Sequence, residues 1–103
     1  MEVIKKISHM IEDEIEGIKC YAKLAAELKD TYPEIAENMY RRSLQEEEHM
    51  KGDHDDVVRI IERYRRENGD PPQDMMAVYN YLHQEHIDAY AKAKAYQEVY
   101  KTK

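Results

Sequence analysis

Two short breaks divide the chain into helices: Asp30-Thr31-Tyr32-Pro33-Glu34 and Asn68-Gly69-Asp70-Pro71-Pro72. In the first break, Thr31 and Glu34 have the spacing of a helix capping box, and a proline fits the first turn of a helix. In the second break, Gly69 can end one helix, and Asp70 before a proline can start the next. The sequence therefore predicts three helices, at about 2–29, 33–68 and 72–100.

Length and composition agree with a single helical domain. The chain has 103 residues, of which 37% are charged, with only 3 Gly and 3 Pro and no Trp or Phe. This composition favours long helices, and a chain of this length buries a modest core that oligomerisation would enlarge. We expect residues 1–103 to form one all-α domain.

The charge of the chain limits its partners. The formal net charge is -6, which argues against nucleic acid, because binding phosphates needs a basic surface. No signal peptide is visible, and no stretch approaches the roughly 20 apolar residues of a membrane span. With one cysteine, Cys20, no internal disulfide is possible. We expect a cytoplasmic protein that contacts neither nucleic acid nor membrane and attracts cations.

Carboxylates interrupt the apolar stripes of the first two helices. The stripes are Ile4, Ile7, Ile11, Glu14, Ile18, Tyr21, Ala25 and Leu28, and then Ile35, Met39, Ser43, Glu46, Met50, Asp53, Val57, Ile61 and Tyr64. Steps of three and four residues are typical of a helix bundle. Glu14 and Glu46 occupy positions where Ile or Leu is usual, and His49 lies three residues after Glu46, on the same side.

In an antiparallel hairpin, these polar residues lie at the same level along the helix axes. Glu14 precedes the turn near residue 31 by about as many residues as Glu46 and His49 follow it. Two buried carboxylates at one level are costly unless a cation neutralises them. Carboxylates with an imidazole suit iron, manganese or zinc better than calcium or magnesium. The sequence therefore predicts a metal site at Glu14, Glu46 and His49, and a solvated acidic face is the alternative.

This pattern resembles the ferritin-like superfamily, in particular the rubrerythrin-type and encapsulated ferritins. In both groups, a first-helix Glu lies seven residues before a Tyr, and a Glu-x-x-His follows on the second helix; here these are Glu14, Tyr21 and Glu46-x-x-His49. The resemblance covers about residues 10–60. It implies that Glu14, Glu46 and His49 bind iron, that Glu16 is an accessory acidic residue, and that the protein is a ferroxidase with a di-iron site.

One chain can supply only half of such a site. The second break spans at most about 20 Å, whereas the second helix is about 50 Å long, so the third helix must fold back beside it. We therefore expect a ferritin-like four-helix bundle completed by dimerisation, with two irons at each homodimer interface and manganese or zinc as substitutes. The sequence does not decide whether such dimers belong to a larger assembly or to a container.

Four residues are secondary candidates for metal binding: Glu16, Asp53, Glu85 and His86. Glu16–Lys23 and Glu85–Lys92 form a weak local repeat, which would place Glu85 in the site. A fold-back about residue 70 instead places Glu85 roughly 10–15 Å away, and we give the register more weight. His83 and His86 are either a surface metal pair or a solvent-facing pair.

Two other functions are compatible with acidic residues on paired helices. A magnesium-dependent all-α nucleotide pyrophosphohydrolase also uses Glu and Asp clusters, but without a histidine ligand. A non-enzymatic helical oligomerisation or adaptor protein would keep the acidic centre only for specificity.

Overall fold

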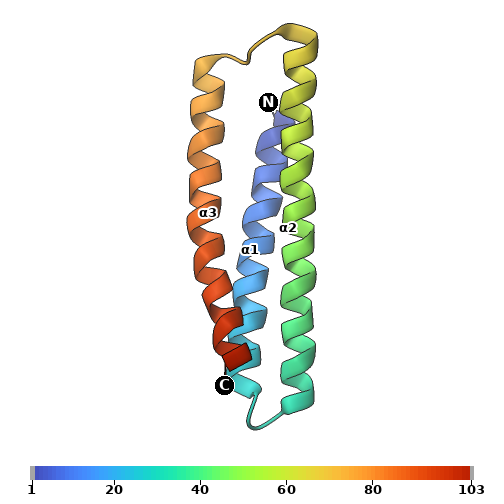
Figure 1. The fold of residues 1–103 in the computed structure, drawn as a ribbon, viewed down its shortest axis with the longest axis vertical. Helices are drawn as coiled ribbons and strands as arrows, with labels where there is room; N and C mark the ends of the chain where they lie inside the picture. Colours follow the sequence, from blue (N-terminus) through green and yellow to red (C-terminus); the bar gives the residue numbers. More distant parts are fainter. Residues whose placement is uncertain (1, 103) are drawn as a thin grey trace.

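The computed structural model describes residues 2–102, which form three helices, each antiparallel to the one before it: α1 (Glu2–Leu28), α2 (Pro33–Asn68) and α3 (Gln73–Thr102) (Figure 1). The prediction of an all-α chain with three helices is confirmed, and the helix ends fall within two residues of the expected positions. The described residues contain no strand. None of their helices is long and apolar enough to cross a membrane.

The helix ends use less side-chain capping than expected. Tyr32 caps the start of α2 without a side-chain hydrogen bond, so the capping box predicted from Thr31 and Glu34 is wrong. Pro33 opens the helix, where its missing N–H costs nothing. Gly69 ends α2 as expected: it has a φ of 84°, and its N–H donates to the carbonyl of Arg65 at 3.0 Å.

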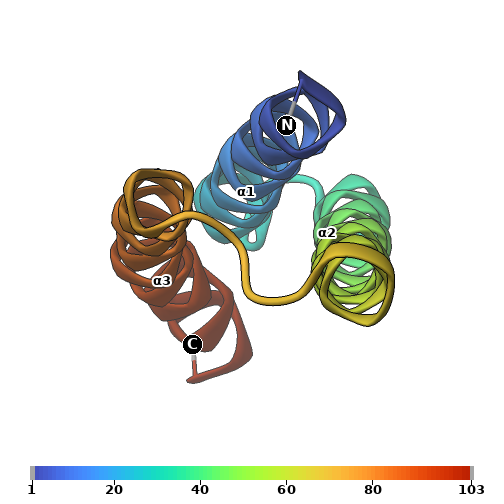
Figure 2. The ribbon, with the colours of Figure 1, turned by 90° about the horizontal axis from the view of Figure 1, so that it is seen from above.

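The three helices form an open arrangement with α1 between the other two. α1 packs along both α2 and α3, whereas α2 and α3 contact each other at few positions. Figure 2 shows this from above, with α2 and α3 on either side of α1. The molecule measures 56 × 19 × 18 Å. A fourth helix would complete a bundle of this kind.

The buried face of α1 is rotated from the predicted stripe. Ile15 and Ala22 are buried, whereas Ile7, Glu14 and Tyr21 are only half-buried. Because α1 packs against two helices, its inward face is centred between them. The predicted stripe therefore lies along the edge of this face, and Glu14 is at the margin of the core rather than inside it.

Side chains from α2 and α3 meet along one line, which we call the α2–α3 seam. Tyr40 and Tyr100 stack with ring centroids 4.7 Å apart, and Gln97 donates to Ser43 Oγ at 3.2 Å. These pairs confirm that α3 folds back about residue 70. The seam continues through Glu47, Tyr90 and Lys94, and then through His54 and His83.

Candidate metal centre

Glu14 and Asp53 meet at the edge of the α1–α2 interface. Glu14 Oε1 and Asp53 Oδ2 are both buried, and no third residue within residues 2–102 donates a hydrogen bond to either oxygen. Burial, then a hydrogen bond and charge repulsion from Asp53, and then the charge of Glu46, raise the pKa of Glu14 to about 8. At neutral pH the Glu14 carboxyl is therefore largely protonated, and it can donate its proton in a hydrogen bond to Asp53.

This cluster lies on the side of α1 away from α3. Glu12 approaches His86 of α3, and Glu16 lines a hollow with α3 residues such as Ala89. Residues two apart on a helix point about 200° apart. Glu14, two residues from each, therefore points away from α3. We call this side of the hairpin, with Glu14, Glu46, His49 and Asp53, the outer face.

Glu46 rests on a glycine of α1. A β-carbon added at Gly17 would lie 2.5 Å from Glu46 Oε2, so only glycine leaves room for the carboxylate in its present position. The glycine that drew attention in the sequence, Gly52, behaves differently: a β-carbon there would meet no atom of residues 2–102 within 4 Å. The position of the Glu46 carboxylate therefore depends on Gly17, whereas Gly52 faces open space.

His49 stands at the exposed border of the outer face. Its Nδ1 lies 3.2 Å from Glu46 Oε1, and its side chain is 63% exposed. The structure thus places Glu46 close to both Glu14 and His49, and adds Asp53 to the cluster. Within residues 2–102, however, no three His, Cys, Asp or Glu side chains are arranged to hold a metal ion together.

The other secondary candidates lie elsewhere. Glu16 accepts a hydrogen bond from Cys20 Sγ at 3.5 Å and faces α3. Glu85 is exposed, and His86 is buried against α1. Only Asp53 joins the predicted ligands. Cys20 is exposed and not buried as a small apolar residue would be.

Sequence reasoning missed Glu47, a buried carboxylate that is hydrogen-bonded to α3. Glu47 is buried and accepts hydrogen bonds from the Tyr90 hydroxyl and, at 3.2 Å, from Lys94 Nζ. Burial alone would raise the pKa of Glu47, but these hydrogen bonds, with the charges of Lys94 and Lys51, hold it below its usual value. The signal was the spacing Ser43, Glu47, Met50, which also steps by four and three.

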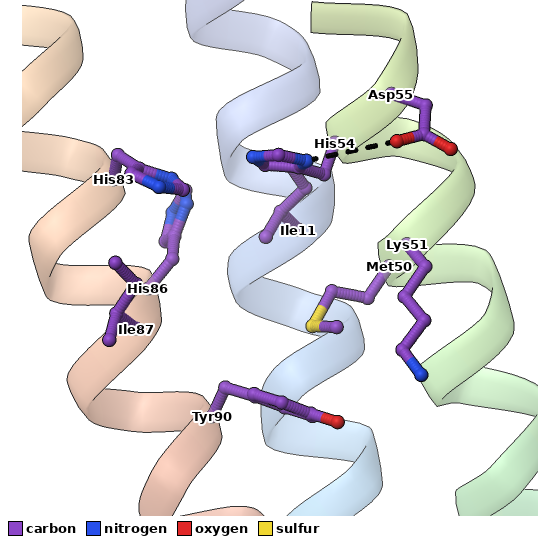
Figure 3. A pocket seen from close by; sticks show the side chains of 9 residues that line it. All are labelled: Ile11, Met50, Lys51, His54, Asp55, His83, His86, Ile87 and Tyr90. Carbon is purple, nitrogen blue, oxygen red and sulfur yellow. Dashed lines mark ion pairs between the residues drawn. The ribbon is translucent and has the colours of Figure 1, made fainter. Parts of the chain in front are cut away.

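Imidazoles form a second polar cluster at the α2–α3 seam. His54 stacks on His83 with ring centroids 5.0 Å apart, and Tyr79 stacks on the same histidine at 5.6 Å. His86 is only 8% exposed. The expectation of a solvent-facing pair is wrong for His86, which is buried, whereas His83 is half-buried; both side chains line the groove between the helices (Figure 3).

Comparison with known proteins adds no assignment. No protein-family model matches the chain, and no curated protein or solved structure is significantly similar to it. The functional argument therefore depends on the two clusters themselves.

Proposed function

We propose that the protein binds Fe(II) on its outer face and oxidises it, with Glu14, Glu46 and His49 as ligands and Asp53 as a fourth. The observation that carries this proposal is the pair of buried oxygens, Glu14 Oε1 and Asp53 Oδ2, to which no third residue within residues 2–102 donates a hydrogen bond. Oxygen atoms of this kind gain most from a divalent cation, and His49 adds the nitrogen donor that favours iron over magnesium.

A second copy of the chain would complete the site. By helical spacing, four exposed apolar side chains lie on the same side of α1 and α2 as the acidic centre: Val3, Met10, Leu24 and Ile35. Val3, Met10, Gly17 and Leu24 repeat every seven residues along α1, which is the spacing of a helix–helix seam. Two outer faces related by a twofold axis would bury these residues and bring together the carboxylates and imidazoles of a di-iron site.

The roles of the residues follow from their positions. Glu14, Glu46 and Asp53 would neutralise the positive charge, and His49 would bind through its neutral imidazole, oriented by Glu46. Fe(II) is the substrate: two Fe(II) ions give up one electron each, and dioxygen accepts both electrons and two protons to form hydrogen peroxide. Because two acidic faces repel each other, cation binding and pairing of the chains would be coupled.

Anaerobic Fe(II) titration followed by admission of air tests the proposal. We expect ferric absorbance to develop quickly with the wild-type protein and at the buffer rate with Glu46→Ala/His49→Ala. The matched control is His9→Ala/Glu12→Ala, because His9 and Glu12 form an exposed pair with the same spacing, 3.4 Å apart, on α1. Equal rates for wild type and Glu46→Ala/His49→Ala would rule out the iron site.

The mass in solution tests the second copy. We expect a dimer with Fe(II) or Zn(II), and a shift towards monomer when EDTA is added or when Met10 and Leu24 are replaced by Lys. A protein that stays monomeric with metal and oxidises iron at the full rate would overturn the shared site.

The three carboxylates also favour one other candidate function. Glu14 and Asp53 each bury one oxygen, whereas the His49 side chain is 63% exposed, so a site made of carboxylates alone would suit Mg²⁺ and a nucleotide pyrophosphohydrolase. Release of pyrophosphate from a nucleoside triphosphate with Mg²⁺, lost in Asp53→Asn but kept in His49→Ala, would select this function. A non-enzymatic adaptor would show neither activity.

A further inference from the structure

The two halves of α3 are attached to the other helices in different ways. In the C-terminal half, residues 90–102, Gln97 is buried and donates a hydrogen bond to Ser43 of α2. Lys29 of α1 donates to the Tyr100 carbonyl at 2.6 Å. In the N-terminal half, residues 73–89, the one buried residue is His86, and within residues 2–102 no hydrogen bond joins this half to another helix. The N-terminal half is therefore held by packing and by the charges around His86.

Imidazole rings form much of this packing. His86 is 8% exposed and lies against α1, where its Nε2 is 3.7 Å from Glu12 Oε1. The His83 ring stacks on His54 of α2, with centroids 5.0 Å apart, and on Tyr79 of its own helix at 5.6 Å (Figure 3). Such contacts suit uncharged rings, because a buried charge is costly and two charged rings at this distance repel each other.

Charged and titratable groups approach His83 and His86 from all three helices. They are Glu12 of α1, His54, Lys51 and Asp55 of α2, and Glu85 of α3. Glu12 favours a charged His86, but its side chain is 46% exposed, so water weakens the attraction. Lys51 and Asp55 carry opposite charges, and both are exposed at the edge of the groove. Burial therefore prevails and lowers the pKa of both His83 and His86, and neighbouring histidines lower it further.

The direction of these changes makes the packing sensitive to acid. An exposed histidine has a pKa of about 6.5. As the pH falls below this value, the N-terminal half of α3 binds more protons when it is released than when it is packed. The packing is therefore strongest above about pH 6.5 and weakens on acidification. Residues 90–102 contain no histidine, so the effect is confined to the N-terminal half.

We propose that acid opens the groove between α2 and α3: protonation of His83 and His86 separates residues 73–89 from α1 and α2, while residues 90–102 stay bound. The released segment also loses helical structure, because most of the stability of a protein helix comes from its packing. The side of α1 that carries Ile11, which lines the groove in Figure 3, is then exposed. This response is separate from the outer face and does not depend on iron.

Amide hydrogen exchange tests the proposal when it is expressed as protection factors, which remove the pH dependence of the intrinsic exchange rate. Between about pH 7.5 and pH 5, the protection of residues 73–89 should fall about tenfold relative to that of residues 90–102. His83→Gln/His86→Gln should lose this relative change, because glutamine does not titrate. The matched control is His9→Gln, which removes a histidine whose side chain is 77% exposed on α1 and should respond as wild type does.

Titration of the wild-type histidines by NMR guards against loss of folding in the double variant. The imidazole signals of His83 and His86 should titrate below the value of about 6.5 of an exposed histidine. Titration of both at or above this value would overturn the proposal. Equal loss of protection in the two halves of α3, or a wild-type response in His83→Gln/His86→Gln, would overturn it as well.

Discussion

Glu46 and Glu47 are neighbours in the sequence and point only about 100° apart around α2, yet their surroundings are of opposite kinds. Glu47 faces the α2–α3 seam and accepts hydrogen bonds from Tyr90 and Lys94. Glu46 faces the outer face, where Glu14 and Asp53 hold buried oxygens to which no third residue within residues 2–102 donates a hydrogen bond. One run of acidic residues thus supplies Glu47, a carboxylate with hydrogen-bond donors around it, and Glu46, which lies beside carboxyl groups that lack such donors.

The difference separates stability from function. A buried carboxylate with a hydroxyl and an ammonium around it fixes the position of α3 and needs nothing more. Buried carboxylates that face each other destabilise the isolated chain, and such sites are where ligands are expected. The outer face therefore carries the function proposed for the chain, and the seam holds the third helix in place.

The largest effect is expected from removing the Glu47 carboxylate, which is hydrogen-bonded to Tyr90 and Lys94. Glu47→Ala should lower the free energy of unfolding by about 3 kcal/mol, because it leaves the Tyr90 hydroxyl and the Lys94 ammonium without their buried partner. Glu48→Ala removes the same charge at an exposed position and should change stability by less than about 0.5 kcal/mol. Urea unfolding measures both. Equal effects would mean that Glu47 does not hold the seam.

A smaller effect, which depends on pH, is expected from the contact between Glu14 and Asp53 on the outer face. The folded-state pKa of Glu14, about 8, exceeds its ordinary value of 4.5. The folded chain therefore binds more protons than the unfolded chain in this range, and stability must fall as pH rises through it. Without metal, we expect a loss of about 2 kcal/mol between pH 4.5 and 8, reduced by partial contact of the side chain with water.

Glu14→Gln isolates this pH effect, because the histidines titrate in both proteins. The stability of wild type minus that of Glu14→Gln, measured by urea unfolding with EDTA present, should decline steadily from pH 4.5 to 8. A constant difference would show that Glu14 has the same pKa in the folded and unfolded chain. Ionised carboxylates would then be tolerated on the outer face, as Glu47 is at the seam.

The sequence allowed the helices and their order to be predicted because each break contains a proline and the second also contains a glycine that ends α2. Register was also predictable: the short loops leave α3 no choice but to fold back, so Tyr100 reaches Tyr40. The rotation of α1 was not predictable from α1 alone. It depends on packing against two helices at once, which moves Ile15 inward and Glu14 to the margin.

The candidate site was predictable in part. Heptad spacing led to Glu14 and Glu46, but it could not distinguish the stripe with Glu46 from the one with Glu47, since both step by three and four. Asp53 was only a secondary candidate because its closeness to Glu14 arises from side-chain contact across helices. The partner of the buried Glu47 oxygens, Tyr90, is 43 residues away in the sequence, and no local pattern connects them.

The smallest effect is expected from two glycines, and it tests whether the outer face is built for a ligand. Gly52→Ala should raise the free energy of unfolding by about 1 kcal/mol, since the added methyl meets open space and alanine favours a helix. Gly17→Ala should gain less, because its methyl must displace the Glu46 carboxylate. Gly17→Ala should have a larger effect on metal binding. Its affinity for Fe(II) should be lower than that of wild type, whereas Gly52→Ala should bind Fe(II) as wild type does. If Gly17→Ala gains the same stability as Gly52→Ala and binds Fe(II) equally well, the position of Glu46 over Gly17 has no part in the site.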